Sequence, residues 1–240
     1  MPNQISKIKK LDIEDLNKEK IFESDLLIHS EHNGLDIIYA PFESINKKAK
    51  VVIVGINPGW RHLADSYKYI IKNKNLSDDV LKIEAKRYAC FSGAMRNRLI
   101  GWLDDIGIQK SLEIQSSSLL FDILGQEALH STSVLRYTAF INKKNYSGHS
   151  PNILGIPYFR KHIENIFVPE IQIFSKCLII PLGSAVQKVF NYISTLKMKN
   201  FKYIVNGFPH PSSLNVGSGK LFKERKDSFI KVVSNWTNNV

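Results

Sequence analysis

The 240-residue chain is long enough to bury one substantial core, and its 43% hydrophobic and 23% charged residues are typical of a soluble globular protein. No apolar run is long enough to span a membrane and no apolar signal core follows Met1. The chain has only two cysteines, a count that fits a reducing cytoplasm, and we expect a cytoplasmic protein. Cys90 and Cys177 are too few for a disulfide framework or a four-thiolate iron–sulfur site. The net charge of +11 favours a polyanionic partner, although generic surface lysines would give the same excess.

Strand-like and helix-like segments alternate along the chain. Apolar runs closed by glycine, proline or polar residues predict an edge strand over residues 35–40 and four more strands over 51–54, 129–135, 177–182 and 201–205. We expect helices over residues 11–27, from 77–78 onward, and over 94–106, 158–168, 184–196 and 221–236. This alternation predicts an α/β fold: a three-layer α/β/α sandwich with a central, mainly parallel four-stranded sheet, forming a single domain over residues 1–240.

Local signals predict where three of these helices begin or end. Gly107 is a natural stop for the helix before it. Pro169 is expected to end the helix over 158–168, because proline has no N–H for an interior helical bond. Ser184 and Gln187 have the spacing of a capping box at the start of the next helix.

The stretch Val51 to Gly59 contains the first candidate site. Its apolar start predicts a strand buried on both faces, and it ends abruptly in Gly55-Ile56-Asn57-Pro58-Gly59. The glycines permit a tight turn and Pro58 restricts Asn57 to extended angles, so one amide side chain is held out at a strand end. Ligands bind at such strand ends in open α/β sheets. An ordinary turn is the alternative, and the pattern is neither a phosphate loop nor a dinucleotide fingerprint.

A second polar cluster follows the last predicted strand. His210 lies between Pro209 and Pro211, so the backbone around its imidazole is stiff. Ser212 and Ser213 offer hydroxyl groups beyond it. A structural role for a lone histidine is the alternative, but its place at a strand end of the same sheet favours a functional one.

Together these stretches resemble the paired active-site motifs of the uracil-DNA glycosylase superfamily. The first resembles the version with Asn in mismatch-specific and single-strand-selective members, and His210-Pro211-Ser212-Ser213-Leu214-Asn215 resembles the second motif. Phe91-Ser92-Gly93 resembles a segment of the iron–sulfur-containing bacterial members. The resemblance spans residues 51 to about 230.

The resemblance implies a role for each matched residue. Asn57 would hold a water beneath the anomeric carbon, and neutral His210 would donate to a carbonyl oxygen of the departing base. Phe91 would stack on a flipped base, a role for which simple core packing is the alternative. The remaining substrate-binding residues would be Gly55, Ile56, Pro58, Ser131 and Thr132. The DNA-binding residues would be Ser212, Ser213, Leu214 as a wedge, Asn215 and Lys220, with Lys223 and Arg225 as further phosphate contacts.

The resemblance also implies a monofunctional glycosylase of base-excision repair that removes uracil or another deaminated base. The family usually places Asn at the end of the second strand, where this chain has His130-Ser131-Thr132-Ser133, so a base other than uracil stays open. The cluster cysteines are missing, so we expect no metal and no cofactor. We expect single- or double-stranded DNA as the partner, and a monomer because flipping a base needs no partner subunit. A non-catalytic nucleic-acid-binding protein and a nucleoside or nucleotide hydrolase remain alternatives. The loop over 142–157 matches no motif, and its length suggests substrate contact.

Overall fold

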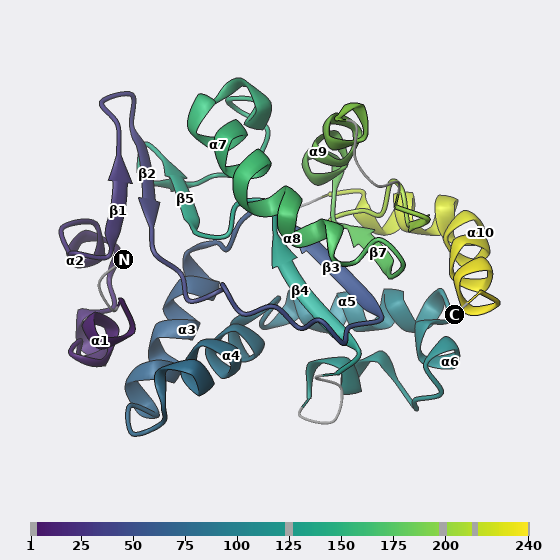
Figure 1. Ribbon diagram of the computed structural model, residues 1–240, viewed down its shortest axis with the longest axis horizontal. Helices are drawn as coiled ribbons and strands as arrows, with labels where there is room; N and C mark the ends of the chain where they lie inside the picture. The colour runs from purple at the N-terminus through teal and green to yellow at the C-terminus, as the bar shows by residue number, and fades with distance from the viewer. Residues whose placement is uncertain (1–3, 123–126, 197–200, 213–215, 240) are drawn as a thin grey trace. The chain divides into compact units, whose positions relative to one another are not determined.

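A computed structural model describes residues 4–122, 127–196, 201–212 and 216–239 (Figure 1). The chain divides into two compact units, and each is described by itself. Unit 1 comprises residues 1–44, 57–90 and 135–150, and unit 2 comprises residues 45–56, 91–134 and 151–240.

Unit 2 contains the parallel sheet that the sequence predicts. Its strands are β3 (Val51–Gly55), β4 (Leu129–Ser133), β7 (Leu178–Pro181) and β8 (Tyr203–Ile204), in the order β4-β3-β7-β8. All three pairings are parallel, and every residue of β3 is buried. The predicted α/β class with a four-stranded parallel sheet is therefore confirmed. In this register Gly55 pairs with Ser133, so β3 and β4 end side by side.

Helices pack around this sheet. They are α5 (Ala94–Asp105), α6 (Ile108–Ser111), α7 (Pro157–His162), α8 (Val168–Gln172), α9 (Ser184–Thr195) and α10 (Ser218–Thr237), with short 3-10 turns at Ser117–Phe121 and Ile153–Gly155. In Figure 1, α8 crosses in front of β4 and α5 runs behind the sheet. Gly107 takes a left-handed φ of 88° after α5, as its position in the sequence predicts.

Unit 1 contains a second, antiparallel sheet that sequence reasoning did not predict. Its strands are β1 (Leu27–Ser30), β2 (Leu35–Ile38), β5 (Thr138–Ile141) and β6 (Lys144–Asn145), in the order β1-β2-β5-β6. The helices of this unit are α1 (Gln4–Lys9), α2 (Lys18–Phe22), α3 (Trp60–Lys72) and α4 (Asp78–Ala89), which share one hydrophobic core with the sheet. Ser77 caps α4 by accepting from the Val80 N–H, so the predicted helix start is confirmed.

Two expectations about these elements are wrong. The predicted edge strand over 35–40 is interior, because β2 pairs with β1 on one side and with β5 on the other. The single helix expected over 11–27 is instead a 3-10 turn (Ile13–Asp15), α2 and the start of β1. Asn17 explains the break, since its side chain accepts from the Lys20 N–H and caps α2.

Two helix-end expectations also fail. Pro169 does not end its helix, because α7 continues through a π turn (Ile163–Phe167) into α8 and Pro169 falls in the first turn of α8. Proline is tolerated there because the widened turn precedes it. Ser184 makes no capping box, because the N-cap is Gly183 and the Gln187 side chain accepts from the Gly207 N–H.

Candidate active site

The ends of β3 and β4 in unit 2 bring three of the relevant residues together. A Cβ added to Gly55 would lie 3.4 Å from the Ser133 Oγ and 3.8 Å from the Phe91 ring. Phe91 and Ser133 therefore both lie beside the backbone of Gly55, at ordinary van der Waals distance from the place of a Cβ. Ile56, the next residue, is also buried.

Phe91 has an unusual backbone for a bulky residue. Its φ is 54°, in the left-handed region, and its side chain is 8% exposed. Such a conformation costs about 1 to 3 kcal/mol and persists only where the surroundings impose it. With this backbone conformation the Phe91 ring lies against the end of β3, beside Gly55. Residues held in such strain cluster at functional sites.

The side chains of β4 alternate between the two faces of the sheet. Ser131 and Ser133 share the face of Phe91, whereas His130 and Thr132 face α8 and are buried. The Thr132 hydroxyl donates to Glu170 Oε1 at 2.5 Å, and His130 Nε2 lies 3.0 Å from the same oxygen. The structure therefore does not bring Thr132, an expected substrate contact, to the face of Phe91. Its neighbour Ser133 occupies that place.

His210 is held by contacts that define which of its ring nitrogens can donate. The Ser212 backbone N–H donates to His210 Nδ1 at 3.2 Å. In a neutral imidazole, which carries a single ring proton, accepting at Nδ1 places that proton on Nε2. The ring is half-buried. This arrangement makes Nε2 a hydrogen-bond donor.

The backbone before His210 is anchored in the core of unit 2. The Gly183 N–H donates to the Phe208 carbonyl at 2.8 Å, and a Cβ on Gly183 would lie 3.1 Å from the His210 Cβ. Phe208 is buried among Trp102, Phe222 and Phe229, with ring centroids 5.3 to 5.8 Å from its own. The backbone before His210 therefore contacts the turn after β7 and packs against aromatic side chains of α5 and α10.

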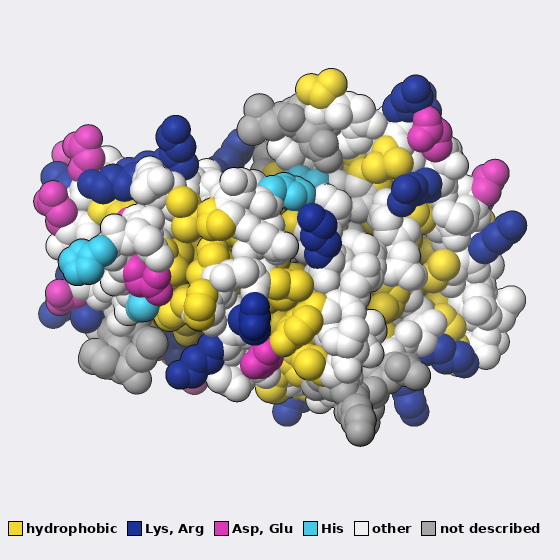
Figure 2. All heavy atoms as spheres, turned by 90° about the horizontal axis from the view of Figure 1, so that it is seen from above, with side chains coloured by type: hydrophobic (Ala, Val, Ile, Leu, Met, Phe, Trp, Pro, Cys, Tyr) yellow, Lys and Arg dark blue, Asp and Glu magenta, His cyan; other side chains and the backbone are white. Residues whose placement is uncertain are grey.

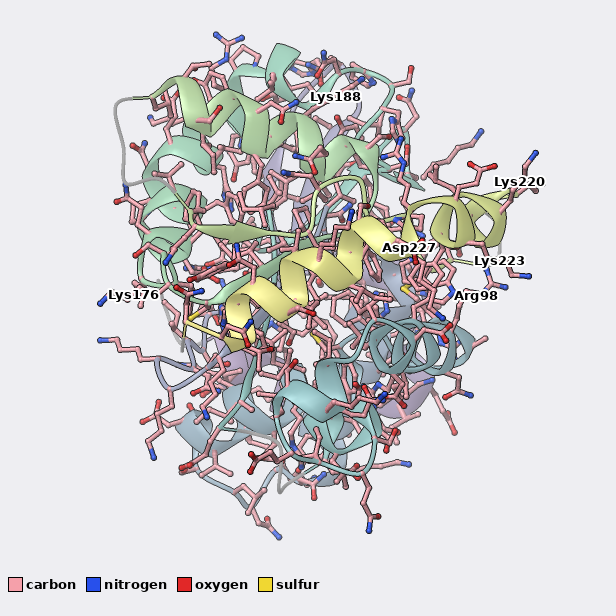
Figure 3. The ribbon with its side chains drawn as sticks, turned by 90° about the vertical axis from the view of Figure 1, so that its right-hand side faces the viewer. Arg98, Lys176, Lys188, Lys220, Lys223 and Asp227 are labelled. Carbon is pink, nitrogen blue, oxygen red and sulfur yellow. The ribbon has the colours of Figure 1, made fainter. Side chains whose placement is uncertain are left out.

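Cationic side chains lie on the elements beside this loop. Arg98 of α5 donates to the Ser212 carbonyl at 3.3 Å. Figure 3 shows Lys220 and Lys223 projecting from the N-terminal half of α10, toward the same edge of the view as Arg98. The Lys220 side chain is 84% exposed. Lys and Arg side chains stand singly or in small groups on the face drawn in Figure 2. The expected DNA contacts Ser213, Leu214 and Asn215 lie outside the described residues.

Asn57 is half-buried in unit 1, where its amide is inserted between the strands of a hairpin. Tyr146 N–H donates to the Ala139 carbonyl at 3.0 Å, as in an ordinary antiparallel pair. The reciprocal bond is replaced: the Ala139 N–H donates to Asn57 Oδ1 at 3.1 Å, and Asn57 Nδ2 donates to the Tyr146 carbonyl at 2.5 Å. These partners fix which end of the amide is oxygen, and they leave one lone pair on Oδ1 and one N–H on Nδ2.

The loop over 142–157 is thus partly structural, because it contains β6 and the 3-10 turn at Ile153–Gly155. Asn145 Oδ1 accepts from the Trp60 N–H at the start of α3. The Tyr146 ring is buried, and burial raises the pKa of its phenol. Pro58, an expected substrate contact, is buried in the turn that these residues hold.

The comparison with known families agrees with this geometry. The family described as the uracil DNA glycosylase superfamily matches residues 42–236. The chain belongs to this superfamily. It is also 34% identical over 216 residues to a Bacillus subtilis (strain 168) protein named uncharacterized protein YoxB, covering 88% of this chain and 84% of that protein. The predicted family is therefore confirmed.

Membership in the uracil DNA glycosylase superfamily indicates glycosylase chemistry on DNA. Within the described ranges, no helix has the length and apolar character needed to cross a bilayer. Sequence reasoning missed Ser133, Glu170 and Asn145. Side chains of a strand alternate between its two faces, so the choice of Ser131 could have predicted Ser133 on the same face. Glu170 and Asn145 could not be predicted in this way, because their roles depend on contacts between distant segments.

Proposed function

We propose that this superfamily member is a monofunctional DNA glycosylase that hydrolyses the N-glycosidic bond of uracil or another deaminated base. The observation that supports it most is the Ser212 N–H bond to His210 Nδ1. In a neutral ring, this bond places the proton on Nε2. A glycosylase needs a donor of this kind, because negative charge grows on the base as it leaves. Binding to DNA alone requires no such donor.

His210 would act on the leaving base. As the C–N bond breaks, its electron pair passes to the base, and a carbonyl oxygen of the base gains negative charge. The His210 Nε2–H would donate to that oxygen. One donor of this type contributes about 3 to 4 kcal/mol in the transition state.

Asn57 would act on the water. Its fixed Oδ1 has a lone pair that can accept from a water directed at the anomeric carbon, and an amide orients water without abstracting its proton. The water oxygen bonds to the sugar, and its proton ends on the released base by way of solvent. A carboxylate would assist this step more strongly, so we expect slow chemistry.

The flipped base would stack on Phe91 at the ends of β3 and β4. Ser131 and Ser133 would meet its polar edge, with Gly55, Ile56 and Pro58 shaping the backbone around it. A hydroxyl cannot make the paired contacts of an amide, so we propose a deaminated base without fixing it as uracil.

The DNA strand would lie against the 210–212 loop and the start of α10. Ser212, Lys220 and Lys223 are suited to phosphate oxygens, and Arg98 adds a further cation. We further propose that Ser213 and Asn215 contact the backbone and that Leu214 fills the space left by the flipped nucleotide. The protein would act as a cytoplasmic monomer in base-excision repair.

Oligonucleotides with a single uracil, hypoxanthine or xanthine test the proposal, both single- and double-stranded. After incubation and alkali, we expect strand breaks at one lesion type that vanish in Asn57→Ala and His210→Ala. Tight, salt-sensitive binding without breaks would instead support a non-catalytic DNA-binding protein. Cleavage of free nucleosides in preference to DNA would support a nucleoside hydrolase. Lys74→Ala, an exposed change in unit 1, is the control.

A further inference from the structure

The hairpin of β5 and β6 holds the turn with Asn57 at two separate points. The first is the inserted amide of Asn57 itself. The second is Asn145, whose Oδ1 accepts from the Trp60 N–H at 3.0 Å. Both contacts therefore fall on the four consecutive residues 57–60.

The contact from Asn145 takes the place of an ordinary helix cap. Trp60 is the first residue of α3, and Gly59 at the N-cap position has no side chain to accept a bond. The first N–H groups of a helix lack partners within it. Asn145 supplies an acceptor from 85 residues away along the chain, which fixes where α3 begins. Because Trp60 is also the last residue of the 57–60 turn, the same hydrogen bond fixes the end of that turn.

The hairpin has its own conformational restraints. Asn142 and Lys143 have φ of 49° and 59°, the left-handed pair that suits a tight turn between twisted strands. Gly34 makes room for this turn, because a Cβ there would lie 2.1 Å from Asn142 Oδ1. The hairpin can therefore serve as a rigid support for the 57–60 turn.

We propose that Asn145 is a positioning residue that orients the Asn57 amide through the start of α3. The inference rests on the proposed function, in which the Asn57 amide holds the attacking water, because Asn145 would set the orientation of that amide. Asn145 acts through Asn57 and need contact neither the water nor the base.

Three variants test it: Asn145→Ala, Asn145→Asp and the control Asn75→Ala. Asn75 is exposed, and its side chain makes no hydrogen bond to any described residue. In Asn145→Ala we expect the single-turnover excision rate to fall about ten- to a hundredfold with Kd for lesion DNA unchanged. The Trp60 amide should exchange faster, and the Asn57 side-chain NH2 signal should shift. Asn145→Asp keeps the acceptor at a helix N-terminus, where negative charge is favourable, and should restore the rate.

Thermal unfolding establishes that each variant is folded. An unchanged rate in Asn145→Ala despite faster Trp60 exchange would overturn the proposal. An equal loss in Asn145→Asp would overturn it too, because the acceptor oxygen would then be irrelevant. If the wild-type protein releases no base from any lesion, the proposed function fails. The Asn57 side-chain signal in Asn145→Ala still decides whether Asn145 orients the amide: an unmoved signal refutes it.

Discussion

The amide inserted in the hairpin makes a specific prediction about Asn57→Asp. The substitution keeps the size of the side chain and retains an acceptor for the Ala139 N–H. It replaces the Nδ2 donor, 2.5 Å from the Tyr146 carbonyl, with a second oxygen. Two oxygens then face each other where one hydrogen bond had been.

The loss of a donor to a buried acceptor costs about 1 to 3 kcal/mol, and we expect the free energy of unfolding to fall by that amount. Urea unfolding at neutral pH measures it, with exchange of the Ala139 amide as a local readout. Asn75→Asp, the same change at an exposed position of unit 1, is the control and should cost no more than about 0.5 kcal/mol. If Asn57→Asp is as stable as its control and the hairpin amides stay protected, the Asn57 amide does not hold the hairpin.

Three further predictions test other parts of the account. Gly183→Ala places a Cβ 3.1 Å from the His210 Cβ at a φ of +86°, so the excision rate should fall while lesion binding, measured by fluorescence anisotropy, is retained. Unimpaired excision would show that the loop tolerates the displacement. Arg98→Gln, Lys220→Gln and Lys223→Gln combined should reduce the slope of log K against log salt by about 2 to 3, and an unchanged slope would place the DNA elsewhere. Thr132→Val removes the hydroxyl that donates to Glu170. It should lower the free energy of unfolding by about 1 to 3 kcal/mol without altering which base is removed. Ser133→Ala should alter which base is removed and leave the free energy of unfolding nearly unchanged. A changed base preference in Thr132→Val would contradict the assignment of these residues to the two faces of the sheet.

The sequence predicts the parts of this fold whose signals are local. The buried strand before Gly55, the helix capped by Ser77 and the stop at Gly107 all follow from short stretches of chain. The parallel sheet follows from the alternation of strands and helices.

Contacts between distant segments explain what the sequence could not predict. The antiparallel sheet of unit 1 joins β2 to β5, which lie about a hundred residues apart, and its strands are too short for a clear periodicity. The hydrogen bond from Thr132 to Glu170 joins residues that are 38 positions apart, and no local sequence pattern predicts the π turn before α8. The motif draws attention to Asn57, but the bonds of its amide to Ala139 and Tyr146 belong to a hairpin more than eighty residues away.

Direct detection of the released base tests the central claim. Lesion oligonucleotides are incubated with excess protein, and the free base is quantified by mass spectrometry for the wild-type protein and for His210→Ala. We expect release of one deaminated base by the wild-type protein and a rate lower by about a hundredfold or more in His210→Ala. Equal release by both proteins, or no release from any lesion, would contradict it.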